Sequence, residues 1–273
     1  MSQSIKNIRD FFYDPRLKEI NVDDPRLIDI HNIILSEKKI LKSAFNHFYD
    51  VLLKCKKKYI TGSGIEIELG AGVGFLKEKR KNIIATDIRK SKKIDKFLNA
   101  QKMNLNANSV STIYAINVFH HLSDPNLFFS EAIRVLAEGG GVILIEPHNG
   151  FSSSLIHKHL HKNEKFDVHQ KSWSNHKIKG PLSGANQALS YIIFERDKEK
   201  FIGLYGGELE IRFKGYINNY LRYFFSGGLN FRQLSPNFLL PLLRLIELLL
   251  IPFSRFLSLH EVIVLVKKRK IKT

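Results

Sequence analysis

A strand, a glycine-rich turn and a short helix in immediate succession constrain the fold of this 273-residue chain more than any other feature. The stretch reads IEIELGAGVGFLKE over residues 65–78, with apolar residues alternating before the glycines and a helix-like pattern after them. A turn of this kind lets backbone N–H groups approach a ligand that a Cβ atom would keep away. The stretch therefore predicts a strand–turn–helix unit that binds a nucleotide-like group.

The spacing of the glycines narrows the choice of ligand. Gly70, Gly72 and Gly74 alternate with other residues, whereas a dinucleotide fingerprint would place its third glycine at Phe75. The Gly-Lys-Ser/Thr of a phosphate-binding loop does not follow these glycines. Glu68, two residues before the first glycine, would repel a pyrophosphate and could pair with an ammonium or sulfonium group. The turn therefore favours a positively charged nucleoside without phosphates.

Strand-like and helix-like segments alternate after the glycine turn, which indicates a parallel sheet with crossover helices. The strand predicted over 82–88 contains Asp87, whose carboxylate could accept hydrogen bonds from two ribose hydroxyls. The helix predicted over 124–136 begins with Asp124 and Pro125, which are typical of an N-cap and a first helical position. We therefore assign the chain to the α/β class, with a mostly parallel sheet and helices on both faces.

Periodicity and composition divide the chain into four segments. These are an N-terminal helical cap (1–58), a cofactor-binding core (59–149), an inserted lid or acceptor region (150–206) and the last two strands with an intervening apolar helix (207–273). The inserted region shows no clean helix or strand period, which is typical of a functional lid. In the last segment we predict a loop over 221–231 and a buried or interfacial helix over 238–253. Burial is favoured there because the helix is apolar nearly all round.

Several motifs in a fixed order make the chain resemble the class I S-adenosylmethionine-dependent methyltransferases of the methyltransferase domain 11 type. The resemblance rests on EIELGAGVG, ATDI, LNAQKMNL and the run from Asn108 to Pro147. It implies a Rossmann-like seven-stranded sheet, S-adenosyl-L-methionine as the cofactor and methyl transfer as the reaction. The later phrases GPLSGANQALSYIIFERD and LRYFFSGGL resemble a bacterial subgroup associated with cell-surface polysaccharide or lipid biosynthesis.

The resemblance also implies which residues bind the cofactor. Asp87 would bind the ribose, Ile88 would pack near the adenine, and Asn117 would lie beside the methionine end. The family commonly has Asp-Ala where this chain has Asn99-Ala100, and the Asn side-chain carbonyl can accept the adenine amino proton instead. The full cofactor-binding set is Glu68, Gly70, Ala71, Gly72, Gly74, Asp87, Ile88, Asn99, Ala100 and Asn117.

A hydroxyl acceptor would require a general base, and histidine is the usual base near neutral pH. His120, His121 and His148 follow predicted strand ends on the ligand side of the sheet and are the candidate catalytic residues, with structural roles as the alternative. His157 and His161 have the i,i+4 spacing of helical metal ligands. No cysteine or H-E-x-x-H motif accompanies them, and methyl transfer requires no metal, so we expect none.

A net charge of +17 raises the question of an anionic partner. The lysines form scattered runs without interleaved aromatics, and the N/D-P-P-Y/F signature of base methylation is missing, so we expect no nucleic-acid partner. The expected partner is a small-molecule or lipid-linked acceptor. The segment 236–259 and the basic tail 267–272 are candidates for peripheral membrane contact.

The remaining expectations concern the compartment and the reaction. A single cysteine and an N-terminus unlike a signal peptide suit the cytoplasm, including the inner face of its membrane, and the oligomeric state stays open. Methyl transfer to a hydroxyl of a glycan or lipid precursor is one function consistent with the sequence. A second is C-methylation in quinone-like lipid biosynthesis, which the 20 phenylalanines suit. A third is a module that binds S-adenosylmethionine without chemistry.

Overall fold

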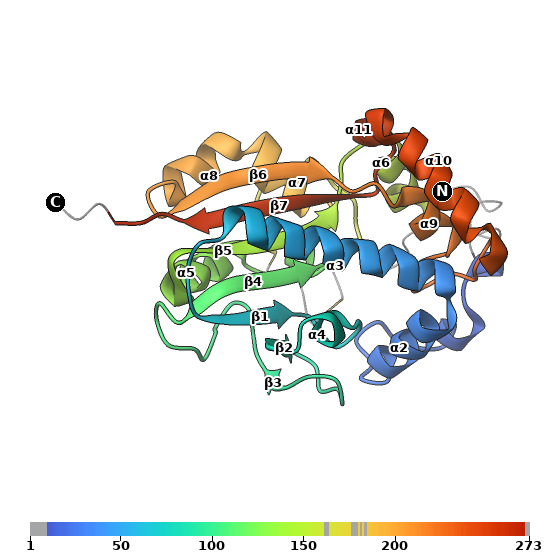
Figure 1. The fold of residues 1–273 in the computed structure, drawn as a ribbon, viewed down its shortest axis with the longest axis horizontal. Coiled ribbons are helices and arrows are strands. Elements are labelled where there is room, and N and C mark those ends of the chain that lie inside the picture. The colour runs from blue at the N-terminus through green and yellow to red at the C-terminus, as the bar shows by residue number, and fades with distance from the viewer. Residues whose placement is uncertain (1–9, 161–163, 176–179, 181, 183–184, 271–273) are drawn as a thin grey trace.

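The computed structural model describes residues 10–160, 164–175, 180, 182 and 185–270. A seven-stranded sheet in the order β3-β2-β1-β4-β5-β7-β6 runs through the molecule (Figure 1). The strands are β1 (Ile65–Leu69), β2 (Ile83–Asp87), β3 (Lys96–Phe97), β4 (Val110–Ile116), β5 (Leu136–Pro147), β6 (Leu209–Tyr216) and β7 (His260–Lys267). The pairs among β1 to β5 are parallel, whereas β7 is antiparallel to both β5 and β6. The predicted α/β class with a mostly parallel, seven-stranded Rossmann-like sheet is confirmed.

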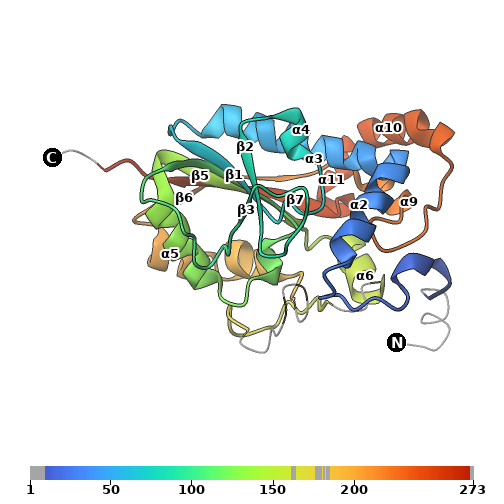
Figure 2. The same ribbon diagram turned by 90° about the horizontal axis from the view of Figure 1, so that it is seen from below.

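Helices cover both faces of this sheet. They are α2 (Leu27–Glu37), α3 (Lys39–Tyr59), α4 (Leu76–Lys79), α5 (Pro125–Val135), α6 (Phe151–Leu160), α7 (Leu189–Tyr191), α8 (Lys198–Tyr205), α9 (Tyr220–Phe225), α10 (Leu240–Leu249) and α11 (Ser254–Leu257). Figure 2 shows α3 and α4 on one side of the sheet and α5 on the other. The helices α6, α9, α10 and α11 gather at one end of the sheet, together with α2 (Figures 1 and 2).

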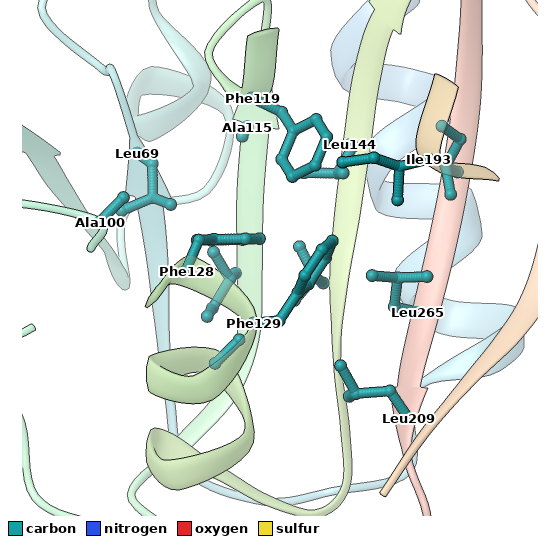
Figure 3. Close-up of a cluster of buried hydrophobic side chains, with 14 of the residues drawn as sticks. Leu69, Ala100, Ala115, Phe119, Phe128, Phe129, Leu144, Ile193, Leu209 and Leu265 are labelled. Carbon is teal, nitrogen blue, oxygen red and sulfur yellow. The ribbon is translucent and has the colours of Figure 1, made fainter. Parts of the chain in front are cut away.

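Aromatic side chains form the core on the α5 face of the sheet (Figure 3). Asp124 caps α5 by accepting a hydrogen bond from the Asn126 backbone N–H, as its position before Pro125 predicts. The helix then buries Phe128 and Phe129 against the strands. The ring centroid of Phe129 lies 5.2 Å from that of Phe201 in α8, so α5 and α8 share one apolar layer.

The helical character of residues 189–205 differs from the irregular lid expected there. Ile192 and Ile193 begin a π-helical turn, η3 (Ile192–Arg196), between α7 and α8, and both side chains are fully buried. These apolar residues cover the sheet beside α5, where a crossover connection to β6 has to pass. Mixed helix types within a short span explain why the sequence shows no single period there.

Two predictions for the last segment are wrong. The loop expected over 221–231 begins as helix α9, because Arg222 pairs with Glu247 of α10 in the interior, with 2.6 Å between Arg222 Nε and Glu247 Oε2. The single helix expected over 238–253, for which burial was favoured, is instead the pair α10 and α11, joined by η5 (Ile251–Phe253). Only part of its surface is covered, and Phe238 is 78% exposed.

The same segment bears on whether the chain could cross a bilayer. Among the described residues, no single helix has the length and apolar character to do so. The two halves Asn237–Leu249 and Ile251–Leu257 meet those criteria only when taken together, and a 66° bend separates them.

The shared aromatic layer predicts the cost of one core substitution. Phe129→Ala should lower the free energy of unfolding by about 3–5 kcal/mol, because it leaves a cavity among packed rings. Leu127→Ala, two residues away on the same helix but 50% exposed, should change it by less than about 1 kcal/mol. Equilibrium urea unfolding measures both values, and similar losses for the two variants would contradict this packing.

Candidate active site

A cavity of about 530 Å³ lies at the end of the sheet where β1, β2 and β4 finish and β7 begins. Open α/β sheets bind ligands beyond the carboxyl ends of their parallel strands, so this is the expected place for a ligand. Polar side chains from five different parts of the chain line it: His31, Glu68, Asp87, Asn117 with His120, and His260.

The glycine loop lies directly on the end of β2. The backbone N–H of Gly72 donates a hydrogen bond of 3.1 Å to Asp87 Oδ2, and that of Ala71 donates one of 2.9 Å to the Thr86 carbonyl. A Cβ atom on Gly72 would come within 2.8 Å of the same Asp87 oxygen and 2.1 Å of Ile28 Cδ1. Glycine is therefore required at position 72 for the loop to lie this close to the carboxylate.

The other two glycines adopt left-handed backbone conformations and have different surroundings. Gly70, with φ of +68°, lines the cavity itself. Gly74, with φ of +141°, lies behind the cavity wall, where a Cβ atom would approach the Tyr49 hydroxyl to 2.4 Å. That hydroxyl accepts a hydrogen bond of 2.9 Å from the Phe75 N–H, so helix α3 holds the loop in place.

Two buried carboxyl groups form the acidic side of the cavity. Asp87 accepts hydrogen bonds from Gly72 N and from Arg89 N, and its Oδ1 lies 3.3 Å from Arg89 Nε. Glu68 is 5% exposed, and burial together with the charge of Asp87 raises its pKa to about 8. The protonated form of Glu68 is therefore favoured at neutral pH, and a cation bound beside it would favour the ionised form.

The residues predicted to surround an adenine also reach this cavity. Ile88, Asn99 and Ala100 all line it, and Ile88 is 44% exposed at its edge. Asn99 Oδ1 already accepts a hydrogen bond of 2.9 Å from the Gln101 N–H. Because an amide oxygen has two lone pairs, it can still accept a second hydrogen bond from an amino group.

Asn117 supplies a buried acceptor at the end of β4. Its backbone has φ of +53°, and its N–H donates a hydrogen bond of 2.8 Å to the Ile145 carbonyl. The side-chain Nδ2 lies 3.4 Å from His260 Nε2, whereas the buried Oδ1 has no hydrogen-bond donor among the described residues. A ligand with an N–H donor would satisfy this oxygen.

A histidine–glutamate pair forms the other side of the cavity. His120 Nδ1 lies 2.5 Å from Glu146 Oε2, and Glu146 Oε1 accepts hydrogen bonds from the N–H groups of Val118 and Phe119. Burial lowers the pKa of His120, but the Glu146 carboxylate outweighs it and raises the pKa above its ordinary value. His120 Nε2, on the other side of the ring, lies 3.8 Å from Glu164 Oε2.

His121 also lines the cavity, with its Nε2 3.8 Å from Glu164 Oε1. Burial and the neighbouring His120 lower the pKa of His121 to about 3, so its imidazole is neutral at physiological pH. His120, His121 and Glu164 each present a ligand atom within 4.8 Å of the others, which is compatible with a divalent cation. The sequence predicted no metal, and the His157–His161 pair weighed for one lies outside the side chains that the structure describes.

The structure corrects the role predicted for His148. Its ring lies outside the cavity lining, with Nδ1 3.2 Å from Glu261 Oε2 and Nε2 3.1 Å from the Arg255 carbonyl. Both nitrogens have partners and the side chain is buried, so His148 is placed to join β5 to β7 and α11 and not to accept a proton from a substrate. The chain turns away from the cavity after Pro147, which strand-end position alone does not indicate.

Sequence reasoning missed His260 and Tyr223 as cavity residues. The His260 ring lies between Phe48 and Tyr223, with centroid distances of 4.9 and 4.7 Å. His260 opens the final strand, and only the antiparallel direction of β7 brings that opening residue to the cavity end of the sheet. The strand direction follows from tertiary pairing, so the sequence offered no signal for it.

Comparison with known proteins bears on which ligand this cavity binds. Residues 67–144 match the family model described as methyltransferase domain, a span that contains the glycine loop, Asp87, Asn117 and His120. A search among curated proteins found no match. The match spans less than a third of the chain, and it supports methyl transfer as the reaction and S-adenosylmethionine as the cofactor.

Solved structures with a similar fold include two methyltransferases. Geranyl diphosphate C-methyltransferase from Streptomyces coelicolor, with Mg²⁺, geranyl diphosphate and S-adenosyl-L-homocysteine, is 12% identical, with a TM-score of 0.45 over 81% of this chain and 78% of that one. Phosphoethanolamine N-methyltransferase 2 from Haemonchus contortus, with S-adenosyl-L-methionine, is 12% identical, with a TM-score of 0.46 over 96% of this chain and 60% of that one. At these identities the likeness concerns the fold alone.

The raised pKa of Glu68 predicts a pH-dependent affinity for the cofactor. Both the ammonium and the sulfonium of S-adenosylmethionine favour an ionised carboxylate, so binding should release a proton from Glu68. Below about pH 8, affinity should fall by up to about tenfold per pH unit, and above it should level off. Calorimetric titrations across this range, in buffers of different ionisation enthalpy, measure both effects. Glu68→Gln should remove the pH dependence, and a pH-independent affinity in the unmodified protein would contradict this role.

Proposed function

We propose that the protein transfers a methyl group from S-adenosylmethionine to a hydroxyl of a small-molecule, glycan or lipid-linked acceptor, with His120 as the general base. The observation that carries the proposal is the buried Glu146–His120 pair in the cavity lining. Glu146 holds the Nδ1 side of the ring, and Nε2, 3.8 Å from Glu164 Oε2, is the nitrogen that would accept the proton. Transfer to carbon in a quinone-like lipid is the alternative acceptor chemistry.

The pair supports base catalysis through its geometry. A carboxylate on Nδ1 fixes the tautomer in which Nε2 is free to accept a proton, and it stabilises the imidazolium that then forms. Glu146 is itself held by the N–H groups of Val118 and Phe119, so the pair is preorganised before any acceptor binds. A module that only bound the cofactor would have no use for a base oriented in this way.

The remaining residues position the two reactants. The bound cofactor supplies an electrophilic methyl group, so the protein has to align the acceptor oxygen and exclude water. Asn117 Oδ1 and Glu68 would hold the ammonium and sulfonium end of the cofactor, and Asp87 would accept hydrogen bonds from the ribose. The Arg89 side chain lies 3.3 Å from Asp87 Oδ1, so the carboxylate would have to interact with Arg89 and the ribose at the same time.

Replacement of the base gives a direct test of this proposal. His120→Ala should lower the rate of methyl transfer by roughly 10²–10⁴-fold and leave the affinity for S-adenosylmethionine nearly unchanged. The rate is measured by mass spectrometry of methylated products from a panel of nucleotide sugars, polyprenyl-linked glycans and hydroxylated quinone precursors. Product NMR then distinguishes O-methyl from C-methyl groups.

Three further measurements accompany this test. His148→Gln, outside the cavity, should keep the rate if circular dichroism shows an intact fold. In the unmodified protein the rate should rise with pH through a midpoint above the ordinary histidine value of 6.5, since His120 must lose its proton to act. The same assays with a chelator separate base catalysis from a metal held by His120, His121 and Glu164. A full rate in His120→Ala would contradict the proposed role.

A further inference from the structure

The segment between β6 and β7 exposes a row of large apolar side chains. Eight of them are between 49% and 78% exposed: Phe238, Leu242, Leu245, Leu248, Leu249, Ile251, Phe253 and Phe256. We call these residues the apolar ridge. Isolated exposed apolar residues are ordinary, but eight of them within one short segment are typical of an interaction surface.

The ridge is an ordered feature of the fold. In α10 the exposed Leu242, Leu245 and Leu249 recur at intervals of three and four residues, so they lie along one side of the helix. The opposite side buries Leu243 and Glu247. The Arg222 backbone N–H and side chain both bond to the Glu247 carboxylate, at 2.8 and 2.6 Å, and fix the helix to α9.

The exposed charges within the segment 238–257 have one sign. Arg244 and Arg255 are exposed on α10 and α11. Glu247 is the one carboxylate between residues 238 and 257, and it is buried against Arg222. The surface therefore presents apolar groups and cations, within a chain whose net charge is +17. This combination is typical of segments that lie in the headgroup region of an anionic membrane.

The apolar ridge lies next to the cavity. Helix α9 packs against α10 and carries Tyr223, which lines the cavity, and β7 begins with His260 three residues after α11 ends. Helix α6 packs beside α11 and adds two further exposed apolar residues, Phe151 at 79% and Leu155 at 57%. The ridge and the cavity therefore share one end of the molecule (Figure 1).

We propose that the apolar ridge docks the protein on the surface of an anionic lipid bilayer and thereby presents the cavity to a lipid-linked acceptor. The substrate part of this inference rests on the proposed function, whereas the docking part does not. A second copy of the chain suits the surface less well, because a symmetric contact would bring the cations Arg244 and Arg255 of both copies together. The 66° bend between the two helical halves suits a segment lying in the interface.

Vesicle sedimentation tests the docking. The full chain is mixed with vesicles of phosphatidylcholine alone or with about one third phosphatidylglycerol, at low and at high salt. We expect binding to the anionic vesicles that weakens with salt. The triple variant Leu242→Ser, Leu245→Ser, Leu249→Ser should reduce the partition coefficient by roughly a hundredfold or more, since each leucine contributes about tenfold when buried in lipid.

A matched control distinguishes docking through the apolar ridge from non-specific adsorption through any exposed apolar residue. Leu127→Ser with Leu204→Ser removes apolar residues that are 50% and 57% exposed on α5 and α8, and it should leave vesicle binding unchanged. Arg255→Gln should weaken binding to anionic vesicles by roughly fivefold and have no effect with phosphatidylcholine alone. Equal loss in the control and ridge variants, or no binding to anionic vesicles, would overturn the docking.

Two further measurements test self-association and cofactor binding separately from membrane docking. Light scattering after size-exclusion chromatography should show that the unmodified protein is a monomer. If the unmodified protein is a dimer and the ridge variant is a monomer, self-association would replace the membrane proposal. Calorimetry with S-adenosylmethionine reports separately on the cavity. Unchanged cofactor affinity with lost vesicle binding in the ridge variant would support docking, whereas failure of cofactor binding in every form would contradict only the proposed function.

Discussion

The arrangement of the site depends on the buried carboxylate of Glu146. It accepts hydrogen bonds from the N–H groups that follow β4 and from the ring of His120. A carboxylate this deep in the interior is costly unless it is fully hydrogen-bonded, so the end of β5 and the turn after β4 have to stay together. That single requirement places Asn117 and His120 at the same cavity. The glycine loop is fixed in a comparable way on the other side, where Gly72 donates to Asp87.

The cavity is thus divided into two electrostatic halves. Glu68 and Asp87 make one half acidic, which suits a ligand carrying an ammonium and a sulfonium but no phosphate. The neutral His121 and the oriented His120 form the other half, which suits an acceptor that has to lose a proton. Both halves are built from residues at strand ends, so the same parallel sheet that supports the core also brings the two reactants together. Stability and function are separable here, because the core on the α5 face contributes few residues to the cavity.

The sequence alone predicted those parts of the site that depend on local chemistry. The glycine spacing, the acid at the end of β2 and the Asp124-Pro125 helix start each follow from a few neighbouring residues, and the structure has all three in the predicted elements. The prediction that His148 lies at the cavity failed for another reason. The direction of the chain after Pro147 is set by packing against β7 and α11, which no local pattern shows. The exposure of residues 238–253 was missed for a similar reason. A stretch that is apolar nearly all round carries no sign of which side will find a partner, and the Arg222–Glu247 pair that selects the buried side joins residues far apart in the sequence.

The measurement that tests the central claim most directly is calorimetric titration with S-adenosylmethionine and S-adenosylhomocysteine, on the unmodified protein and on Asp87→Ala and Asp87→Asn. The account predicts micromolar binding of both compounds by the unmodified protein and a loss of roughly tenfold or more in each variant, because a carboxylate that accepts two ribose hydroxyls contributes more than about 1.4 kcal/mol. Circular dichroism checks that the variants remain folded. Failure of the folded, unmodified protein to bind either compound, or equal binding by the Asp87 variants, would contradict the assignment of this cavity as the cofactor site.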